Sequence, residues 1–499
     1  MSRRGGSHGS LNIIGLLLLL GSLGCVDEKI VYRDGPNYAA PPTAAASFLG
    51  YSDEANKVTV CGNCHVGQQA RWKDTKHADA FATLASSGSM QGFCQACHTV
   101  NDLGNVATDT TAGWRSTKDT RYHDVQCESC HGPGLQHVQA PTRGQMLASI
   151  KADTAKSLKT GCSECHSGVH NPFVEDWRSS RHATSYTRAY NSLTSTPAAP
   201  EVPGGPRAAC VGCHVGQNIL GNWGVNTDYV EKTLGQTNAT AVGITCAVCH
   251  DPHGTPNSKN LRFPIDARDL DNNLCMKCHY RRAVPDFSGS QNSPHSPQGP
   301  MLLGQAGWWP PGIQVDGDIV ASHGTERNPR LCATCHVNRY DVTDKATGKF
   351  VQTVTGHRFD PIPCVDSNGL PTVTQECEVS QRSFKSCAAS GCHSEATARQ
   401  AMNSAEADIL VLTNALQTML IDPKVPASDK LSGKVSTWRG STFNRNLALS
   451  PGSEVHNPFL AKALLRASIA QMAKDYGIVP PIAISLLAPY DKRILSATN

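Results

Sequence analysis

The stretch Cys61-Gly62-Asn63-Cys64-His65 is the first copy of a pentapeptide that decides how this chain folds. Two cysteines separated by two residues, with a histidine directly after the second, recur along the 499 residues. Eight copies keep this spacing, and a ninth has four residues between its cysteines. They are numbered motif 1 to motif 9 in chain order and span residues 61–65, 94–98, 127–131, 162–166, 210–214, 246–250, 275–279, 332–336 and 387–393.

This pattern is typical of the covalent attachment of haem c. The two thiols of a motif bond to one porphyrin, and the histidine after them coordinates the iron from the proximal side. The sequence therefore predicts nine haem c groups, eight from regular motifs and one from motif 9. The attachment cysteines are Cys61, Cys64, Cys94, Cys97, Cys127, Cys130, Cys162, Cys165, Cys210, Cys213, Cys246, Cys249, Cys275, Cys278, Cys332, Cys335, Cys387 and Cys392. The proximal histidines are His65, His98, His131, His166, His214, His250, His279, His336 and His393.

Other uses of paired cysteines fit the regular motifs less well. A structural zinc ion is bound by two Cys-x-x-Cys segments that together supply four tetrahedral ligands. Zinc does not require a histidine after every second cysteine. A redox dithiol would be one motif on one βαβ unit. A disulfide framework belongs to short secreted chains. For motif 9 the alternative of a disulfide between Cys387 and Cys392, beside an incidental His393, stays open.

Three of the 21 cysteines lie outside the motifs. We expect Cys364 and Cys377 to form a disulfide, which the oxidising compartment of an exported protein permits. Export is predicted by residues 1–24, where a short positive segment and an apolar run at 11–20 read as a secretory signal peptide. No other stretch is long and apolar enough to span a bilayer.

Cys25 stands directly after the predicted signal peptide, as the cysteine of a bacterial lipoprotein box does. The match is imperfect because Ser22 occupies the position of the usual leucine. We expect Cys25 to carry a lipid anchor that places the protein at the outer membrane, facing the periplasm or the cell surface. Ordinary cleavage with a free or buried thiol is the alternative.

The composition is poor in core-forming residues. Only 39% of residues are hydrophobic and 6% aromatic, beside 43 glycines and 30 prolines. The chain should therefore be mostly coil with short α-helices wrapped around covalently bound haems, with little or no β-sheet. Because the haems would supply most of the core, we expect the chain not to fold without them. The formal net charge is +4, haem propionates would make it negative, and no basic patch predicts nucleic-acid binding.

Twenty histidines are available for nine irons. Nine are proximal and His8 lies in the signal peptide, which leaves ten candidates for the distal side. Because ten candidates face nine irons, we expect two histidines to ligate each iron. Such an iron has no open coordination position and is suited to electron transfer. Methionine is the competing ligand, but Met90, Met146 and Met301 are expected to fill core gaps instead. The distal candidates are His77, His137, His170, His182, His253, His295, His323, His357, His456 and, as the expected surplus, His123.

The spacing of motifs and of Pro/Gly-rich stretches predicts the domain organisation. Apolar residues at helical spacing predict a C-terminal helix pair at 396–421 and 458–476. The predicted segments are a signal peptide (1–24), a tether (25–48), a four-haem region (49–192), a Pro-rich linker (193–207), a three-haem region (208–287), a two-haem region (288–394) and a C-terminal helical region (395–499).

The four-haem region resembles the cytochrome c554 family over about residues 55–185. Motif 1 followed by Trp72-x4-His77-Ala78, and motif 3 continuing as Gly132-Pro-Gly-Leu-Gln-His137, carry this resemblance. The remainder looks like the outer-surface multihaem cytochromes of metal-reducing bacteria, through Ser293-Pro-His295, motif 8, Thr355-Gly-His357-Arg-Phe359 and Val455-His456-Asn-Pro458. The resemblance implies haems stacked into a continuous wire. It also implies distal roles for His77, His137, His182, His357 and His456.

These features predict a nonahaem c-type cytochrome that carries electrons by haem-to-haem hopping in the outer envelope or at the cell surface, in extracellular or metal respiration. The expected partners are other redox proteins, extracellular metal or mineral acceptors, or further copies of the chain in a polymer. The alternative is a multihaem reductase of nitrogen or sulfur oxyanions with one open haem. No catalytic residue is predicted.

Overall fold

The structure is a computed structural model. It describes residues 48–104, 113–143, 145–152, 161–168, 171–191, 208–225, 228–233, 240–288, 293–315, 317–374, 376–389, 391–481 and 494–496. Backbone contacts divide the chain into Met1–Ala40 and Pro41–Asn499, and every described residue belongs to the second unit. The predicted signal peptide, Cys25, the linker at 193–207 and His170 lie outside the described residues.

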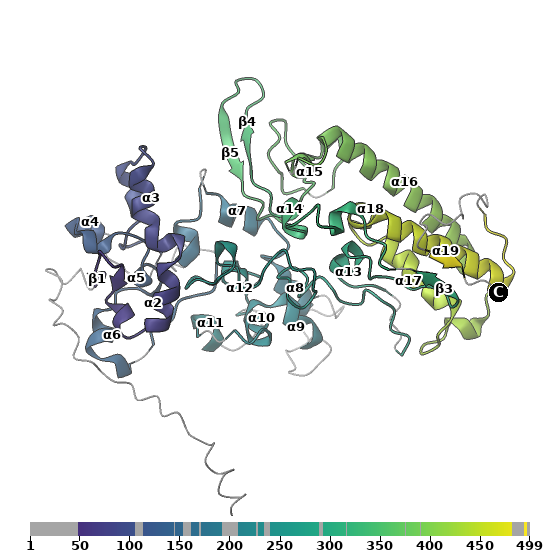
Figure 1. Cartoon of the computed structure of the whole chain (residues 1–499), viewed down its shortest axis with the longest axis horizontal. Coiled ribbons are helices and arrows are strands. Elements are labelled where there is room, and N and C mark those ends of the chain that lie inside the picture. The colour runs from purple at the N-terminus through teal and green to yellow at the C-terminus, as the bar shows by residue number, and fades with distance from the viewer. Residues whose placement is uncertain are drawn as a thin grey trace, which may run out of the picture. The chain divides into compact units, whose positions relative to one another are not determined.

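Short helices dominate the chain up to residue 394 (Figure 1). None of them exceeds eight residues, a length at which a helix in water depends on packing against its surroundings. The α-helices are α2 (Val66–Lys73), α3 (Ala80–Ser86), α4 (Trp114–Thr117), α5 (Cys127–His131), α6 (Leu135–Gln139), α7 (Phe173–Arg178), α8 (Ser185–Asn191), α9 (Ala208–His214), α10 (Gly216–Asn222), α11 (Val230–Thr233), α12 (Cys246–Cys249), α13 (Gln298–Leu302), α14 (Cys332–His336) and α15 (Lys385–Ala388). Single 3-10 turns are η1 (Cys61–Asn63), η2 (Lys76–Asp79), η3 (Gly92–Ala96), η4 (Thr120–Tyr122), η5 (Pro141–Arg143), η6 (Gly161–Glu164), η7 (Ser258–Asn260), η8 (Ser322–Gly324), η9 (Val379–Gln381) and η10 (Ala427–Lys430).

Strands are few, and in the described chain they form antiparallel pairs only. β1 (Tyr51–Asp53) pairs with β2 (Val58–Thr59), and β3 (Ile313–Val315) pairs with β6 (Ile494–Ser496). β4 (Tyr340–Thr343) and β5 (Phe350–Val354) form a hairpin, labelled in Figure 1, in which Tyr340 faces Val354. Short helices with little sheet are what the composition predicts, and this fold class is confirmed.

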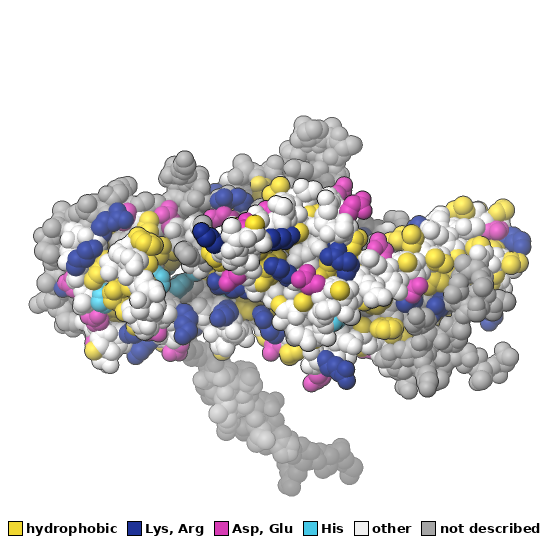
Figure 2. Space-filling view, turned by 90° about the horizontal axis from the view of Figure 1, so that it is seen from above, with side chains coloured by type: hydrophobic (Ala, Val, Ile, Leu, Met, Phe, Trp, Pro, Cys, Tyr) yellow, Lys and Arg dark blue, Asp and Glu magenta, His cyan; other side chains and the backbone are white. Residues whose placement is uncertain are grey.

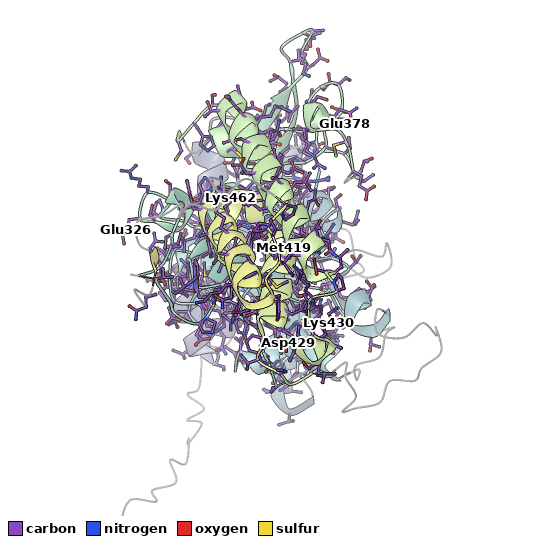
Figure 3. All side chains as sticks on the ribbon, turned by 90° about the vertical axis from the view of Figure 1, so that its right-hand side faces the viewer. Glu326, Glu378, Met419, Asp429, Lys430 and Lys462 are labelled. Atoms are coloured by element: carbon purple, nitrogen blue, oxygen red, sulfur yellow. A yellow bond between two sulfur atoms is a disulfide. The ribbon has the colours of Figure 1, made fainter. Side chains whose placement is uncertain are left out.

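The C-terminal region is built from longer helices that pack together. α16 (Glu395–Leu420) and α19 (Pro458–Tyr476) form the predicted pair, and α17 (Thr437–Ala448) packs against both. The side chain of Ser394 caps α16, and Asn457 caps α19 one residue before a proline at its first position. The single turn α18 (Ser453–His456) precedes α19. In Figure 3 these helices lie together, with Met419 labelled on α16.

The apolar core is concentrated in this C-terminal region. Its largest cluster of buried side chains draws mainly on α16, α17 and α19, whereas the clusters farther towards the N-terminus contain two to four buried residues each. The helices therefore have an apolar core of their own, and the expectation that haems supply most of the core applies to the rest of the chain. On the face drawn in Figure 2, Lys and Arg side chains are interspersed with Asp and Glu.

Candidate haem-attachment sites

Each of the eight regular motifs forms a short helical, 3-10 or hydrogen-bonded turn, whereas motif 9 begins in α15 and is not wholly described. The backbone N–H of the motif histidine donates to the carbonyl of the first cysteine in motifs 1, 4, 6 and 7, at 2.9, 2.9, 2.8 and 3.1 Å. Residues three apart in a helical turn lie on one face, so both thiols of a regular motif point to the same side. The histidine that follows continues the turn. The pentapeptide therefore presents two thiols and one imidazole to a common space.

None of the eighteen motif cysteines, all of which are described, is joined in a disulfide, and this includes Cys387 and Cys392 of motif 9. The structure thus lacks the disulfide that was the alternative for motif 9. Cys364 and Cys377 are joined by a disulfide. Within the described residues, no three His, Cys, Asp or Glu side chains are gathered as a metal-ion cluster.

Eight of the nine motif histidines face a second histidine ring from another part of the chain. In every pair the ring centroids lie 6.1 to 6.4 Å apart. Written with the motif histidine first, the pairs are His65 with His137, His131 with His253, His166 with His77, His214 with His295, His250 with His357, His279 with His182, His336 with His456 and His393 with His323.

This separation can be compared with that of two imidazoles on opposite sides of one metal ion. Bonds of about 1.35 Å place the ring atoms about 1.1 Å from the centre of an imidazole. A metal–imidazole bond is about 2.0–2.1 Å long. The two ring centres are then about 6.3 Å apart, within the range seen in all eight pairs. The donor set of two thiols and two facing imidazoles therefore fits haem c.

Hydrogen bonds from the histidines leave the metal-binding nitrogen available. Nδ1 of His98, His131, His250 and His336 donates to the backbone carbonyls of Ala80, Met146, Lys259 and Phe359, at 2.6 to 2.8 Å. On the distal side, Nδ1 of His323 donates to the carbonyl of Val455 at 2.8 Å. An imidazole that carries its proton on Nδ1 presents an unprotonated Nε2, and the backbone bond fixes the orientation of the ring.

Burial keeps four of the paired imidazoles neutral at pH 7. It lowers the pKa of His77 and His357 to about 4, and that of His182 and His456 to about 3. A histidine binds a metal ion in its neutral form. These rings are therefore in the ligating form at pH 7 without having to lose a proton.

The repeated Trp-x4-His-Ala sequence has one structural role in both copies. Trp72 Nε1 donates to the carbonyl of Val125 at 3.0 Å, and the N–H of Val125 donates to the carbonyl of His77 at 3.1 Å. In the second copy, Trp177 bonds to the carbonyl of Ile244 at 2.7 Å, and the N–H of Ile244 bonds to His182 at 3.0 Å. Each bridging residue lies two positions before a motif, so the repeat holds His77 and His182 next to motifs 3 and 6.

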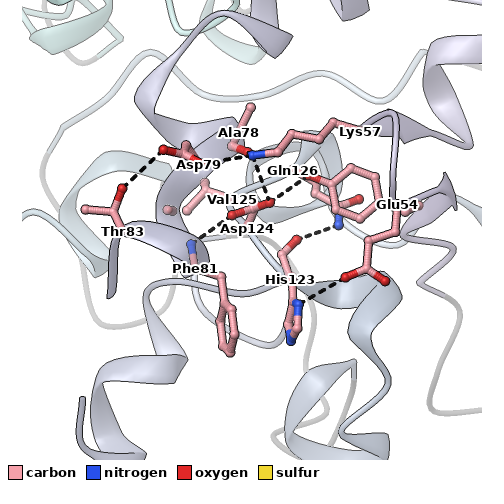
Figure 4. Close-up of polar contacts among 12 residues, drawn as sticks. Glu54, Lys57, Ala78, Asp79, Phe81, Thr83, His123, Asp124, Val125 and Gln126 are labelled. Atoms are coloured by element: carbon pink, nitrogen blue, oxygen red, sulfur yellow. Dashed lines mark hydrogen bonds and ion pairs between the residues drawn. The ribbon is translucent and has the colours of Figure 1, made fainter. Parts of the chain in front are cut away.

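His123, the expected surplus, has a different environment (Figure 4). Its ring lies on that of Phe81, with the centroids 3.7 Å apart and the planes 9° from parallel, and its Nδ1 is 3.2 Å from Glu54. The next residue, Asp124, accepts from the N–H of Phe81 at 2.8 Å and lies 3.8 Å from the ammonium of Lys57. His123 therefore belongs to a packed polar network rather than to a histidine pair.

Comparison with known proteins identifies the class of the chain. The family model described as cytochrome c554 and c-prime matches residues 60–132 and 151–251, and a model of a doubled CXXCH motif matches 239–283. The chain is a multihaem c-type cytochrome. The predicted resemblance to cytochrome c554 is confirmed by this match, which also extends into the three-haem region of the cytochrome.

The cytochrome is similar to longer polyheme cytochromes of Geobacter sulfurreducens. It is 23% identical over 307 residues to the C-type polyheme cytochrome OmcB, a match that covers 55% of this chain and 35% of OmcB. With OmcC the identity is 23% over 233 residues, covering 44% of this chain and 26% of OmcC. The matched part of the cytochrome thus spans about a third of the length of OmcB and about a quarter of that of OmcC.

The crystal structure of the outer cell wall cytochrome OcwA has a similar fold. The TM-score is 0.51 at 16% sequence identity, and the match covers 86% of this cytochrome and all of the OcwA chain. Over the described residues, no helix of the cytochrome is long and apolar enough to cross a membrane.

Proposed function

We propose that this cytochrome is a nonahaem electron carrier in which histidine pairs ligate the irons. The observation that carries the proposal is the set of eight facing ring pairs at 6.1 to 6.4 Å. When bound, each haem supplies a one-electron couple whose potential depends on its ligands and burial. At eight of the nine motifs two imidazoles would occupy both axial positions of the iron, which leaves no coordination position for a substrate at those sites.

The ring pairs support a proposed distal histidine for each of eight motifs. The proposed distal ligands are His137 for motif 1, His253 for motif 3, His77 for motif 4, His295 for motif 5, His357 for motif 6, His182 for motif 7, His456 for motif 8 and His323 for motif 9. His98 of motif 2 is then left without a proposed partner. We propose His170, which lies outside the described residues, as the distal ligand of motif 2.

We further propose that the cytochrome is exported and anchored through a lipid on Cys25, in the outer envelope or at the cell surface. The apolar run at 11–20 followed by Cys25 supports this location. Its structural relative OcwA is an outer cell wall cytochrome, which agrees with a site outside the cytoplasm. Other redox proteins, and extracellular metal or mineral acceptors, would then exchange electrons with it.

Mass spectrometry and electron paramagnetic resonance of the purified holoprotein test the proposal together. We expect nine covalently bound haems and ferric signals that are wholly low-spin. A Cys387→Ala/Cys392→Ala variant should retain eight. Nine haems with several high-spin irons would contradict the proposed histidine pairs, and eight in the unmodified protein would remove motif 9 from the count.

One observation favours a second function, reduction of a nitrogen or sulfur oxyanion. Among the described residues, no second imidazole faces His98, although its Nδ1 donates to Ala80 as in other motifs. An open iron at motif 2 would give a high-spin signal and turnover of nitrite or hydroxylamine. His170→Ala separates the two functions, because the electron carrier gains a high-spin signal on this change and the reductase keeps the one it already has.

A further inference from the structure

We infer that the attachment motifs form a branched path, 1–3–4–6–7–8–9, with motif 2 joined at motif 4 and motif 5 joined at motif 7. This inference rests on the proposed electron-transfer function and names the route within it. It follows from contacts between residues of different motifs, because groups attached to touching motifs are the closest neighbours. The order differs from the order of the motifs in the sequence.

The path begins with motifs 1 and 3. Thr59, two residues before motif 1, has its hydroxyl 3.6 Å from the sulfur of Cys127. The thiols of Cys61 and Cys127 are hydrogen-bonded to each other. Helix α5 of motif 3 in turn packs against η6 of motif 4. Motif 3 is therefore the link between motifs 1 and 4.

Motif 4 is the first junction. Its thiol Cys165 is hydrogen-bonded to Cys97 of motif 2, and its other thiol, Cys162, is hydrogen-bonded to Cys246 of motif 6. The ring of Phe173 supports the second link. Its centroid lies 5.7 Å from that of His166 and 4.9 Å from that of His357, the rings assigned to motifs 4 and 6.

Phe359 connects motifs 6, 7 and 8. Its ring lies 5.8 Å from His357 and 4.4 Å from His182, the distal rings assigned to motifs 6 and 7. Its carbonyl accepts the bond from Nδ1 of His336 in motif 8. The backbone at Phe359 is left-handed, with φ of 57°, a conformation that is uncommon for a non-glycine residue. The surrounding contacts hold it there.

Motif 7 is the second junction. Cys278 is hydrogen-bonded to Cys213 of motif 5, and Cys275 is hydrogen-bonded to Cys332 of motif 8. Met276 of motif 7 also shares a buried cluster with Leu331, against which Cys332 packs. The last link joins motif 8 to motif 9, because α14 packs against α15.

The two ends of the main path are the most accessible attachment sites. Of the eighteen motif thiols, all of them described, Cys64 and Cys392 are exposed and the others are partly buried. They belong to motifs 1 and 9. Redox partners that reach the cytochrome at these sites would exchange electrons with opposite ends of one path.

Electron arrival times test this order. Ser52→Cys provides an exposed attachment point for a ruthenium photosensitiser at motif 1, since the Ser52 hydroxyl lies 3.2 Å from the amide of Asn63 between the motif 1 cysteines. A distal methionine raises the potential of a haem and marks it as an electron trap with its own spectrum. His357→Met places the trap at motif 6, and His295→Met places it at motif 5. His123→Met is the matched control and should create no trap.

We expect the trap at motif 6 to fill before the trap at motif 5, because motif 5 is reached only through motifs 6 and 7. Filling of motif 5 first, as in the sequence order, would overturn the path while leaving electron transfer intact. If neither trap fills after photoreduction of motif 1, the proposed function fails as well. A haem-resolved density map of the unmodified holoprotein tests the order without any variant. The irons of motifs 2, 3 and 6 should be the nearest neighbours of the iron of motif 4, and an adjacent motif 5 iron would overturn the path.

Discussion

The pairing of His336 with His456 can be tested without altering either histidine, through Gly452. This glycine begins α18 in the left-handed region, with φ of 87°, and its carbonyl accepts the N–H of His456 at 2.7 Å. A Cβ added at Gly452 would lie 2.6 Å from Cε1 and 2.9 Å from Nδ1 of His456. Gly452→Ala therefore acts directly on the imidazole assigned to motif 8.

The size of the effect follows from these distances. Carbon–carbon contacts begin at about 3.5 Å, so the His456 ring of the Gly452→Ala variant must move by about 0.9 Å. Metal–ligand distances tolerate about 0.2 Å. We expect one of the nine irons to lose its distal ligand and to become high-spin in electron paramagnetic resonance. The left-handed backbone adds a loss of about 1–2 kcal/mol in the free energy of unfolding.

Gly477→Ala is the matched control. Gly477 ends α19, has φ of 62°, and a Cβ there would meet nothing within 4 Å. This variant should show a similar loss of stability with an unchanged, low-spin spectrum. The reasoning is refuted if Gly452→Ala also stays wholly low-spin while it loses only as much stability as the control.

Three further predictions concern packing and burial elsewhere in the chain. Trp72→Phe and Trp177→Phe should each lower the free energy of unfolding by about 1–3 kcal/mol, because they leave the carbonyls of Val125 and Ile244 unpaired. Thermal unfolding measures both losses. Unequal losses would contradict the common role of the two copies. Burial raises the pKa of Glu128 from 4.5 to about 7. Between these pH values the carboxyl of the folded chain keeps a proton that the unfolded chain releases. The free energy of unfolding should therefore fall by up to about 3 kcal/mol as the pH rises from 4.5 to 7. Glu128→Gln should abolish this component of the pH dependence in denaturant titrations, and an unchanged slope would assign it elsewhere. A Cβ at Gly440 would lie 2.1 Å from the ring of Trp308, so Gly440→Ala should lower the free energy of unfolding by about 1–3 kcal/mol. As the control, Gly67→Ala meets nothing within 4 Å and should raise it by about 0.5 kcal/mol. Equal shifts in Tm for the two variants would argue against the close contact at Gly440.

The class and the fold could be predicted from the sequence because the cysteines and histidines of each motif are adjacent. The candidate sixth ligands could be named as a set but not paired, since the ring of His65 lies opposite that of His137 and the ring of His393 opposite that of His323. Only the folded chain brings these segments together. The repeated Trp-x4-His-Ala was the sequence signal for the bridge through Val125, yet the bridging residue itself has no distinctive context.

The C-terminal helices show a second limit of the sequence. The helices at 395–420 and 458–476 could be predicted because apolar residues recur at helical spacing. Helix α17 could not, because its buried face includes Arg439, Gly440, Ser441 and Asn444. Asn444 bonds to both backbone groups of Trp308, at 2.8 and 2.7 Å, so polar side chains complete the packing there. Hydrophobic periodicity does not detect such a helix.

The hydrogen-bonded thiols of different motifs have a consequence for the biogenesis of the cytochrome. Cys61 with Cys127, Cys162 with Cys246 and Cys275 with Cys332 are neighbours in the fold although far apart in the chain. If the chain reached this conformation in an oxidising compartment with its thiols still unmodified, each pair could close into a disulfide and exclude two cofactors at once. We therefore expect thioether formation to precede tertiary folding. The close spacing of different motifs in the folded chain therefore requires a fixed order of assembly, with haem attachment before folding.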